Sequence, residues 1–419
     1  MIWFLFISFF AMLYIGVPIA FALTASSVLS IIIFTDVPIL IAVQRMFAGL
    51  DVFALMAIPL FLFAGYLMTE VKLSERLVAF ASIFLGRFRG GLSLISTGSS
   101  AVFGAISGSA NATTAAIGSV MIPTMAKRGY DEAHAAAVVA ASGILGLIIP
   151  PSITMVLYGV SANVSIGDLF LNGIVPGLLI AACILAINYV IAIRNGYPAA
   201  EPMSTRQQLT AIRQSVVPML MPLIILGGIY TGAFTPTEAA AVACGYGLLV
   251  GAFVYRNLSI RALVRISRQT AEMSAVILFL IASANIFTYV LASQNVPQNL
   301  AAALVGFSDS PQLILVLILF ALLALGTFLD NVAAVVLVTP TLMPVLAALN
   351  IDPMFFGVFM VTAIAVGQIT PPVGLNLFIA ANLTNTTFER VVVASLPYIA
   401  MYIAILFLFI VFPGLLTIF

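Results

Sequence analysis

Two short polar segments interrupt the apolar sequence, and their side chains are of the kinds that bind small ions and anions. The first, residues 104–114, reads GAISGSANATT. It ends one apolar stretch and begins another, so backbone groups there lose their helical partners and, in lipid, must be satisfied by protein, water or an ion. Neutral oxygens suit sodium, and hydroxyl and amide groups can also hold a carboxylate. The polar side chains of this first tip are Ser107, Ser109, Asn111, Thr113 and Thr114.

The first tip has two interpretations. It can be a sodium site that also contacts an organic anion. It can also be a place where small residues let two helices pack closely. The existence of a second, matching segment favours binding.

The second tip, residues 326–336, reads GTFLDNVAAVV and places a charge in the middle of an apolar region. Asp330 is the only charged residue in 310–351. A charge near the centre of a bilayer is costly unless it is partnered, and no basic residue is near in sequence. We therefore expect Asp330 to bind a second sodium ion with Thr327 and Asn331. A protonated or helix-capping aspartate is the alternative.

A double proline follows each tip and interrupts the next helix. The two segments read SGILGLIIPPSIT at 142–154 and AVGQITPPVGLN at 365–376. Proline removes a backbone donor and disfavours the helical conformation at the residue before it, so carbonyl groups one turn earlier become free. Such carbonyl groups coordinate sodium in transporters with broken helices, and a simple kink is the alternative. The expected ligands are Gly143, Gly146, Pro150 and Ser152 for the first sodium site, and Gly367, Thr370 and Pro372 for the second.

An organic anion is expected between the two tips. Bound cations would neutralise the local field there, and transport is coupled if ion and anion favour the same conformation. The side chains assigned to the anion are Ser107, Ser109, Asn111, Thr113, Thr154 and Asn376.

The tips and breaks belong to a segment that occurs twice. Residues 119–163 align without a gap to residues 340–384, 221 positions later. Broken apolar segments at corresponding positions of two halves indicate a transport site at the membrane midplane. Basic residues flank the first hairpin at both ends and none flanks the second, which predicts two inverted copies. The matched residues are Pro123 with Pro344, Asp131 with Asp352, Gly146 with Gly367, and Pro150-Pro151 with Pro371-Pro372.

The composition is that of a membrane protein with many spans. Of 419 residues, 63% are hydrophobic and 7% are charged, and mean hydropathy is +1.24. A soluble protein carries about 25% charged residues. We therefore predict an all-α polytopic membrane protein. The net charge of +1 gives no sign of a nucleic-acid partner. The sequence has no P-loop, metal motif or nucleophile–base pair, so we expect no enzyme and no cofactor other than sodium as the coupling ion.

The apolar runs predict five regions. Residues 1–90 would form scaffold helices, 91–165 the first hairpin and interrupted helix, 166–311 further scaffold and connecting helices, 312–386 the second hairpin and interrupted helix, and 387–419 a C-terminal helix. The linker 194–214 carries three arginines and is expected on the cytoplasmic side. Spans are expected at 2–23, 25–43, 52–70, 168–193, 215–233, 237–255, 272–292 and 391–417.

Six stretches of the chain resemble those of a known family. They are SGSANAT at 107–113, RGYD at 128–131, IIPPSITMVLYG at 148–159, FTPTEAAAVA at 234–243, FLDNVAAVVLVTPTLMP at 328–344 and ITPPVGLNLF at 369–378. In type and order they are similar to stretches of the large membrane subunit (the M subunit, DctM or SiaM type) of tripartite ATP-independent periplasmic (TRAP) transporters, in the ion transporter superfamily.

This resemblance implies a multi-pass permease subunit in the bacterial inner membrane that imports an organic acid anion with a sodium gradient. The implied substrates are C4-dicarboxylates, sialic acid or sugar acids, with dicarboxylates slightly favoured. It also implies an elevator mechanism, in which the hairpins and interrupted helices move against scaffold helices. The implied partners are a small four-helix membrane subunit (Q), expected as a separate polypeptide, and a periplasmic substrate-binding protein (P), besides membrane lipid.

The resemblance assigns one sodium site to the first tip and its break, and another to Asp330 and the second break. The chain has Val373 where the first break has Ser152, so the two sites are not chemically identical. Two alternatives remain. One is a sodium or proton antiporter of similar inverted-repeat build, with Asp330 titrating. The other is a membrane assembly subunit that does not transport.

Overall fold

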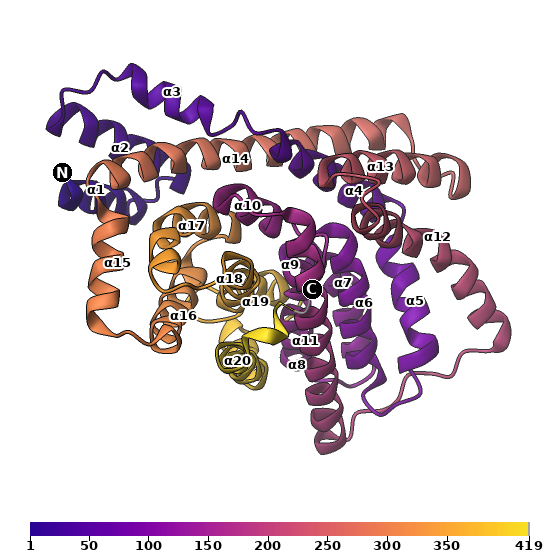
Figure 1. Ribbon diagram of the computed structural model, residues 1–419. Coiled ribbons are helices and arrows are strands. Elements are labelled where there is room, and N and C mark those ends of the chain that lie inside the picture. Colours follow the sequence, from indigo (N-terminus) through magenta and orange to yellow (C-terminus); the bar gives the residue numbers. More distant parts are fainter. Residues whose placement is uncertain (418–419) are drawn as a thin grey trace.

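The computed structural model describes residues 1–417, which form helices and no strands (Figure 1). Eight helices in this part of the chain are long and apolar enough to cross a membrane, or nine spans if one bent pair counts as one. This confirms the expected all-α polytopic membrane protein. The eight are Phe53–Glu70, Ile166–Asn195, Thr205–Tyr230, Pro236–Val254, Ile260–Ser293, Pro311–Phe328, Asn331–Ala348 and Phe388–Val411.

The N-terminal helices are shorter than the sequence predicts. α1 (Ile2–Tyr14) ends just before Gly16, whose φ of +85° lies in the left-handed region. α2 (Ile19–Phe34) begins directly after Pro18. Glycine tolerates this conformation and proline lacks the N–H that would continue a helix, so the chain turns here. The predicted span 2–23 is therefore wrong.

The next predicted span, 25–43, is wrong as well. The chain leaves α2 and forms a separate short helix, α3 (Leu40–Ala48). α4 (Ala57–Glu70) follows a single 3-10 turn and agrees with the predicted span 52–70. α5 (Leu73–Leu85) completes this region.

Much of the polar stretch after α11 (Ile166–Asn195) is helical. α12 (Thr205–Tyr230) begins at a capping box: the Ser204 hydroxyl accepts from Gln207 N at 3.4 Å, and Gln207 Oε1 accepts from Ser204 N at 2.8 Å. Such a pair satisfies two free N–H groups and starts a helix even in a polar sequence. Only residues 196–204 are therefore a non-helical linker, where the sequence suggests 194–214.

The helices after α12 begin with side-chain caps too. Thr235 and Glu238 form a capping box for α13 (Pro236–Leu249). A π turn ends this helix, and α14 (Ile260–Ser293) starts well before the predicted span 272–292 and includes Arg261, Arg265 and Arg268. The short α15 (Val296–Phe307) leads to the second hairpin.

Each tip joins the two helices of a hairpin. The first hairpin consists of α6 (Gly91–Ser107) and α7 (Ala110–Lys127). The second consists of α16 (Pro311–Phe328) and α17 (Asn331–Ala348). Each tip is therefore only two residues long, and each falls in the predicted segment.

A broken helix follows each hairpin. After the first, α8 (Glu132–Gly143) and α9 (Leu145–Ile148) precede the proline pair, and α10 (Ile153–Ala162) continues at an angle of 41°. After the second, α18 (Pro353–Gly367) ends before the proline pair and α19 (Leu375–Ala381) follows it. The peptide bond within each proline pair is cis.

The hairpins and broken helices pack with α11 and α20 (Phe388–Val411) into one body, shown in the lower half of Figure 1. Buried hydrogen bonds join its parts: Tyr402 Oη donates to Ala141 O at 2.8 Å, and Asn188 Nδ2 donates to Thr97 Oγ1 at 2.9 Å. The long α14 runs along the edge of this body with α2, α3 and α4 beside it. We call these four helices the frame.

Candidate functional site

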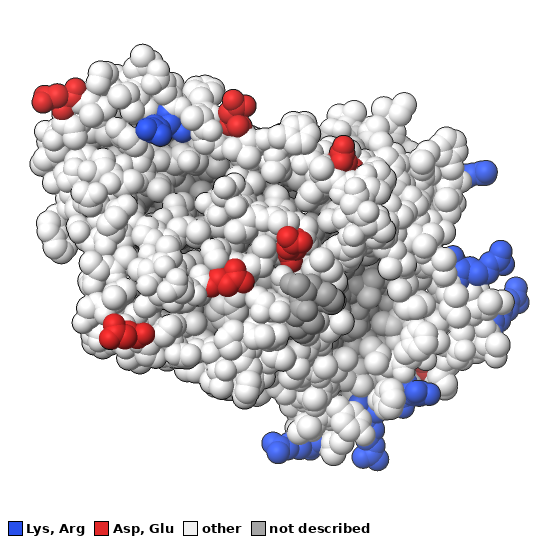
Figure 2. Space-filling model, viewed as in Figure 1, with Lys and Arg blue, Asp and Glu red and all other residues white. Residues whose placement is uncertain are grey.

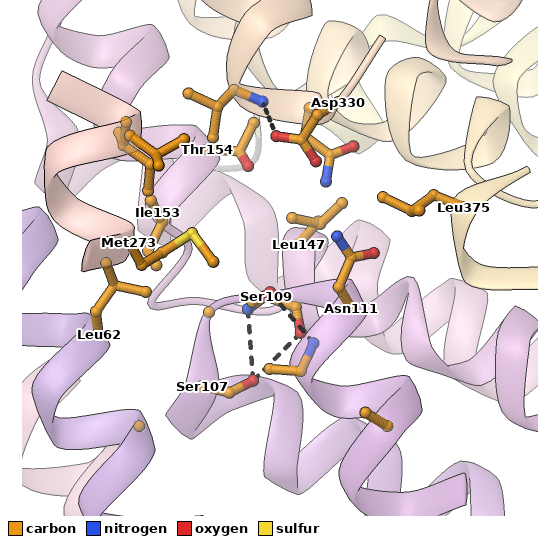
Figure 3. A pocket seen from close by; sticks show the side chains of 18 of the residues that line it. Leu62, Ser107, Ser109, Asn111, Leu147, Ile153, Thr154, Met273, Asp330 and Leu375 are labelled. Atoms are coloured by element: carbon orange, nitrogen blue, oxygen red, sulfur yellow. Dashed lines mark hydrogen bonds between the residues drawn. The ribbon is translucent and has the colours of Figure 1, made fainter. Parts of the chain in front are cut away.

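A cavity of about 850 Å³ lies between the two tips and the frame (Figure 3). Figure 3 shows Asp330 and Asn111 facing the same space, with Leu62 of α4 and Met273 of α14 on the opposite wall. The structure thus brings the two tips, 221 positions apart in sequence, to one site. The predicted site residues that line it are Ser107, Ser109, Asn111, Thr154, Asp330 and Asn331.

Two serines of the first tip, Ser107 and Ser109, line the cavity. Gly108, with φ of +62°, ends α6, and Ser109 caps α7 by accepting from Ala112 N at 3.4 Å. Behind the tip, Thr113 Oγ1 donates to Ser109 O at 2.8 Å and lies 3.0 Å from Ser107 Oγ. The tip is therefore a compact set of oxygens, held by its own hydrogen bonds.

The first break lies directly against this tip. Ile153 N donates to Gly108 O at 3.3 Å. Gly146 lies so close that a Cβ added there would be 2.6 Å from Thr113 Oγ1 and 2.7 Å from Ser109 O. The predicted pairing of tip and break is thus present in space.

The other residues predicted for the first site are buried at this break. A Cβ on Gly143 would collide with the Thr114 hydroxyl. Pro150 and Ser152 are buried, and Ser152 caps α10 by accepting from Met155 N at 3.3 Å. None of these three lines the cavity.

At the second tip, Asp330 caps α17. Its carboxylate accepts from Val332 N at 3.2 Å, and no basic side chain in the described chain forms an ion pair with it. Gln368 Nε2 donates to Leu329 O at 3.3 Å and joins the tip to the second break. Gly367 lies against Gly326 just behind the tip.

Three other residues predicted for the second site, and Asn376, which was predicted for the anion, do not line the cavity. Pro372 is exposed and does not line the cavity. The hydroxyl groups of Thr327 and Thr370 donate to Ala324 O and Val366 O in their own helices. Asn376 is fully buried against α8, where its Nδ2 lies 3.5 Å from Ala140 O.

Several buried oxygens at the tips and breaks accept no hydrogen bond within residues 1–417. An unpartnered buried polar atom is unfavourable, so each points to water or an ion. Two belong to residues outside the predicted ligand sets, Thr114 and Gln368, although both lie in the polar segments. The atoms are Asn111 Oδ1, Thr114 Oγ1, Asn331 Oδ1, Gln368 Oε1 and Asn376 Oδ1.

The cavity contains one carboxyl group and no basic side chain from the described residues. Asp330 is the only acidic residue that lines it, and no Lys, Arg or His of the described chain does. The described residues contain no group of three or more His, Cys, Asp or Glu that could hold a transition metal. A carboxylate among neutral oxygens fits a hard monovalent cation instead.

The frame side of the cavity was not predicted. It is almost entirely apolar, and apolar residues in a membrane helix carry no sequence signal that separates a cavity wall from a lipid-facing surface. Its main residues are Leu62, Gly65 and Tyr66 of α4 and Met273, Val276, Ile277 and Leu280 of α14.

Solved transporter structures share this fold, and YdaH and MtrF are two of them. The YdaH transporter of Alcanivorax borkumensis aligns with a TM-score of 0.63 and 17% identity, over 90% of this chain and 88% of its own. MtrF of Neisseria gonorrhoeae, described as an antimetabolite efflux pump, aligns with a TM-score of 0.58 and 14% identity, over 93% of this chain and 84% of its own. At these identities the likeness concerns the fold alone.

Sequence comparison is more specific. The chain is 41% identical to the isethionate TRAP transporter permease protein DctMQ of Oleidesulfovibrio alaskensis, over 94% of this chain but 62% of that longer protein. It is 36% identical to the C4-dicarboxylate TRAP transporter large permease protein DctM of Rhodobacter capsulatus, over 97% and 95%. It is 35% identical to the sialic acid TRAP transporter large permease protein SiaM of Vibrio cholerae, over 96% and 94%.

The family profile described as "Tripartite ATP-independent periplasmic transporter, DctM component" matches residues 6–415. This match covers both hairpins, both breaks and the frame. The chain therefore belongs to the DctM family of TRAP transporter large permease components.

Proposed function

We propose that this chain is the large subunit of a sodium-driven importer of an organic acid anion. The observation that carries the proposal is Asp330, a carboxylate that borders a membrane cavity without a basic partner in the described chain. Sodium at Asp330 would supply the missing charge. A bound cation would also make the cavity acceptable to a negatively charged solute.

Two cation sites are proposed. One lies at the second tip, where Asp330 is joined by the unpartnered oxygens of Asn331 and Gln368. The other lies at the first tip, where Asn111 and Thr114 leave side-chain oxygens free near the first break. Both sets consist of hard oxygen ligands, which sodium prefers to nitrogen or sulfur.

The anion is proposed to bind on the first-tip side. The N-termini of α7 and α10 meet there, and both are capped by neutral serines, Ser109 and Ser152. A helix N-terminus carries a partial positive charge and favours an anion. Thr154 adds a hydroxyl group: it is 2% exposed, lines the cavity and has no side-chain hydrogen bond in residues 1–417.

The mechanism proposed is an elevator movement of the hairpin body against the frame. The cavity lies between these two parts, and its frame wall is nearly all apolar. An apolar wall makes few hydrogen bonds that a sliding movement would have to break. The two hairpins with their broken helices would act as inverted repeats around the site, as in other secondary transporters.

The names of the relatives suggest the partner subunits and the class of substrate. They are TRAP permeases for isethionate, C4-dicarboxylates and sialic acid. We propose that this chain also works with a small membrane subunit and a periplasmic binding protein in the bacterial inner membrane. Its substrate would be a small organic anion of this range.

Uptake by the reconstituted complex tests the proposal. We expect uptake of a candidate anion into proteoliposomes to require an inward sodium gradient, and Asp330→Ala to abolish it. Asp309→Ala is the matched control, because Asp309 is exposed and outside the cavity. Normal sodium-driven uptake by Asp330→Ala would refute the role of Asp330. Sodium flux that needs no organic anion and responds to a proton gradient would indicate an antiporter instead.

A further inference from the structure

A second groove, of about 330 Å³, lies between α5 and the start of α12. Its polar residues lie on one face of α12, since positions 206, 207, 210 and 214 recur at helical spacing. They include one arginine and two glutamines whose amides can donate hydrogen bonds, whereas the Thr210 hydroxyl already donates to Arg206 O at 2.9 Å. The lining residues are Ala79, Met203, Arg206, Gln207, Thr210, Ala211 and Gln214.

The groove carries positive charge that the described chain does not neutralise. Arg213 lies two turns beyond Arg206 on the same side of α12, and both are exposed. Neither forms an ion pair within residues 1–417, although five other basic residues do. Figure 2 shows that Lys and Arg gather along one edge of the molecule, away from most of the acidic residues on the visible face. The two arginines are therefore available to an external anion.

An apolar surface borders these arginines. Leu209, Ile212 and Val216 are 59%, 37% and 46% exposed and lie on the neighbouring face of α12. Exposed apolar side chains on a membrane-spanning helix face the acyl chains of lipids. We therefore place the arginines at the interface between lipid headgroups and acyl chains, the region that long basic side chains favour.

The wall of the groove is held in place by hydrogen bonds. Ser215 Oγ donates to Arg76 O of α5 at 2.9 Å, and Tyr255 Oη donates to Gln214 O at 2.7 Å. The Arg76 guanidinium lies 3.7 Å from the centre of the Tyr255 ring. These contacts hold α12 against α5 beside the groove.

The groove also lies where the linker 196–204 reaches α12. The linker is tied to the hairpin side of the molecule, since Ala200 N donates to Gly86 O at 3.0 Å and Glu201 pairs with Arg128. Met203, the one linker residue that lines the groove, lies close in sequence to these contacts.

We propose that this groove binds the headgroup of an anionic phospholipid. Arg206 and Arg213 hold its phosphate, Gln207 donates a hydrogen bond from Nε2, and the acyl chains follow the apolar face beside Leu209. Basic clusters at the cytoplasmic edge of a span attract anionic lipids for this reason. A free phosphate shares the headgroup chemistry but cannot use the apolar face, so the lipid is the occupant.

Lipid titration of the purified full-length chain tests this site. Native mass spectrometry in a neutral detergent would count bound phosphatidylglycerol, with phosphatidylcholine as the uncharged comparison. We expect the double variant Arg206→Gln/Arg213→Gln to bind phosphatidylglycerol about 30-fold more weakly, the usual effect of two basic contacts to anionic lipid. Arg261→Gln is the matched control, because Arg261 is exposed and unpaired but lies on α14.

Three results would overturn the proposal, and a lysine variant provides a fourth test. The three results are unchanged phosphatidylglycerol binding by the double glutamine variant, equal binding of phosphatidylcholine, and complete displacement of the lipid by excess inorganic phosphate. The variant Arg206→Lys/Arg213→Lys keeps the charge and should keep most of the binding. If it lost binding as fully as the glutamine variant, charge attraction would not be the cause and the proposal would fail.

Discussion

Ser109 and Asp330 occupy the same place in the two hairpins: each caps the second helix, and both border the cavity. They lie 221 positions apart, which is the spacing of the repeated segment. One cap is neutral and the other is a carboxylate. The neutral cap leaves the positive end of α7 available to an anion, whereas Asp330 already fills the positive end of α17. The repeat thus contains two chemically different half-sites.

Changing Ser109 to aspartate should make the two caps alike and close the anion site. Ser109→Asp keeps the helix capped, because Asp and Ser cap equally well. Its carboxylate would take the place proposed for the anion. We expect anion uptake to be lost while the thermal unfolding midpoint stays close to that of the unmodified protein.

Ser109→Asn is the control for this change, because it also caps the helix but carries no charge. It should retain much of the uptake. Equal loss in both variants would mean that the hydroxyl group of Ser109, and not the charge at the helix end, decides binding.

The tips and breaks could be predicted because they contain residues that are unusual in an apolar helix. A lone aspartate in an apolar region and a double proline within a helix are each unfavourable without a structural reason. Asp330 and Pro150-Pro151 therefore stood out, and the structure places both tips at one cavity. The first break also lies against the first tip, as expected.

The second break differs from the first for a reason visible in one residue. Ser152 caps α10, whereas the matching Val373 has no side-chain oxygen to cap α19. The helix restarts later, after Gly374 with φ of +60°, and the chain at Pro372 is exposed. The sequence shows the exchange of Ser152 for Val373, and the structure shows its consequence, a later helix start at the second break.

Helix limits were less predictable than the site. The sequence of residues 205–214 is polar and reads as a linker, but Arg and Gln are good helix formers and a capping box starts α12 there. The frame wall of the cavity, with residues such as Met273, could not be predicted at all. Only the packing of distant helices determines which apolar residues face the cavity.

Close contact between glycines should limit substitution behind each tip. A Cβ on Gly367 would lie 2.9 Å from Gly326 O, and the opposing group is backbone, which cannot rotate away. We expect Gly367→Ala to destabilise the protein by about 1–3 kcal/mol, the usual effect of overpacking. A lower thermal unfolding midpoint would report it.

Gly245→Ala is the comparison for this effect. A Cβ on Gly245, which lies in α13, meets nothing within 4 Å. Alanine favours a helix over glycine, so this variant should be as stable as the unmodified protein or more so. If both variants lost the same stability, close backbone contact at Gly367 would not be the cause.

Tyr398 should stabilise the hairpin body through a buried hydrogen bond. Its hydroxyl group donates to Asn188 Oδ1, and both side chains are 0% exposed. Tyr398→Phe leaves the amide oxygen buried without this donor, which typically costs about 1–3 kcal/mol. We expect a lower unfolding midpoint, whereas Tyr14→Phe should leave it unchanged because Tyr14 is 93% exposed. An unchanged midpoint for Tyr398→Phe would show that another donor reaches Asn188.

Thr154 and Thr114 should separate anion binding from sodium binding. Thr154 lines the cavity, whereas the Thr114 oxygen is buried behind the first tip, unpartnered and close to Gly143. Valine has nearly the same shape as threonine but lacks the hydroxyl group. We expect Thr154→Val to raise the anion concentration for half-maximal uptake about tenfold, with little change in sodium dependence.

Thr114→Val should have the opposite effect, raising the sodium requirement while the anion requirement at saturating sodium stays the same. Uptake measured over a grid of sodium and anion concentrations separates these parameters. Assigning each hydroxyl group to the anion or to sodium requires opposite effects of the two variants. Ion and anion bind cooperatively, so either variant alone can alter both apparent affinities. If Thr154→Val changed only the sodium dependence, the hydroxyl group at the cavity would belong to the cation site, and the anion would have to bind nearer Asn111.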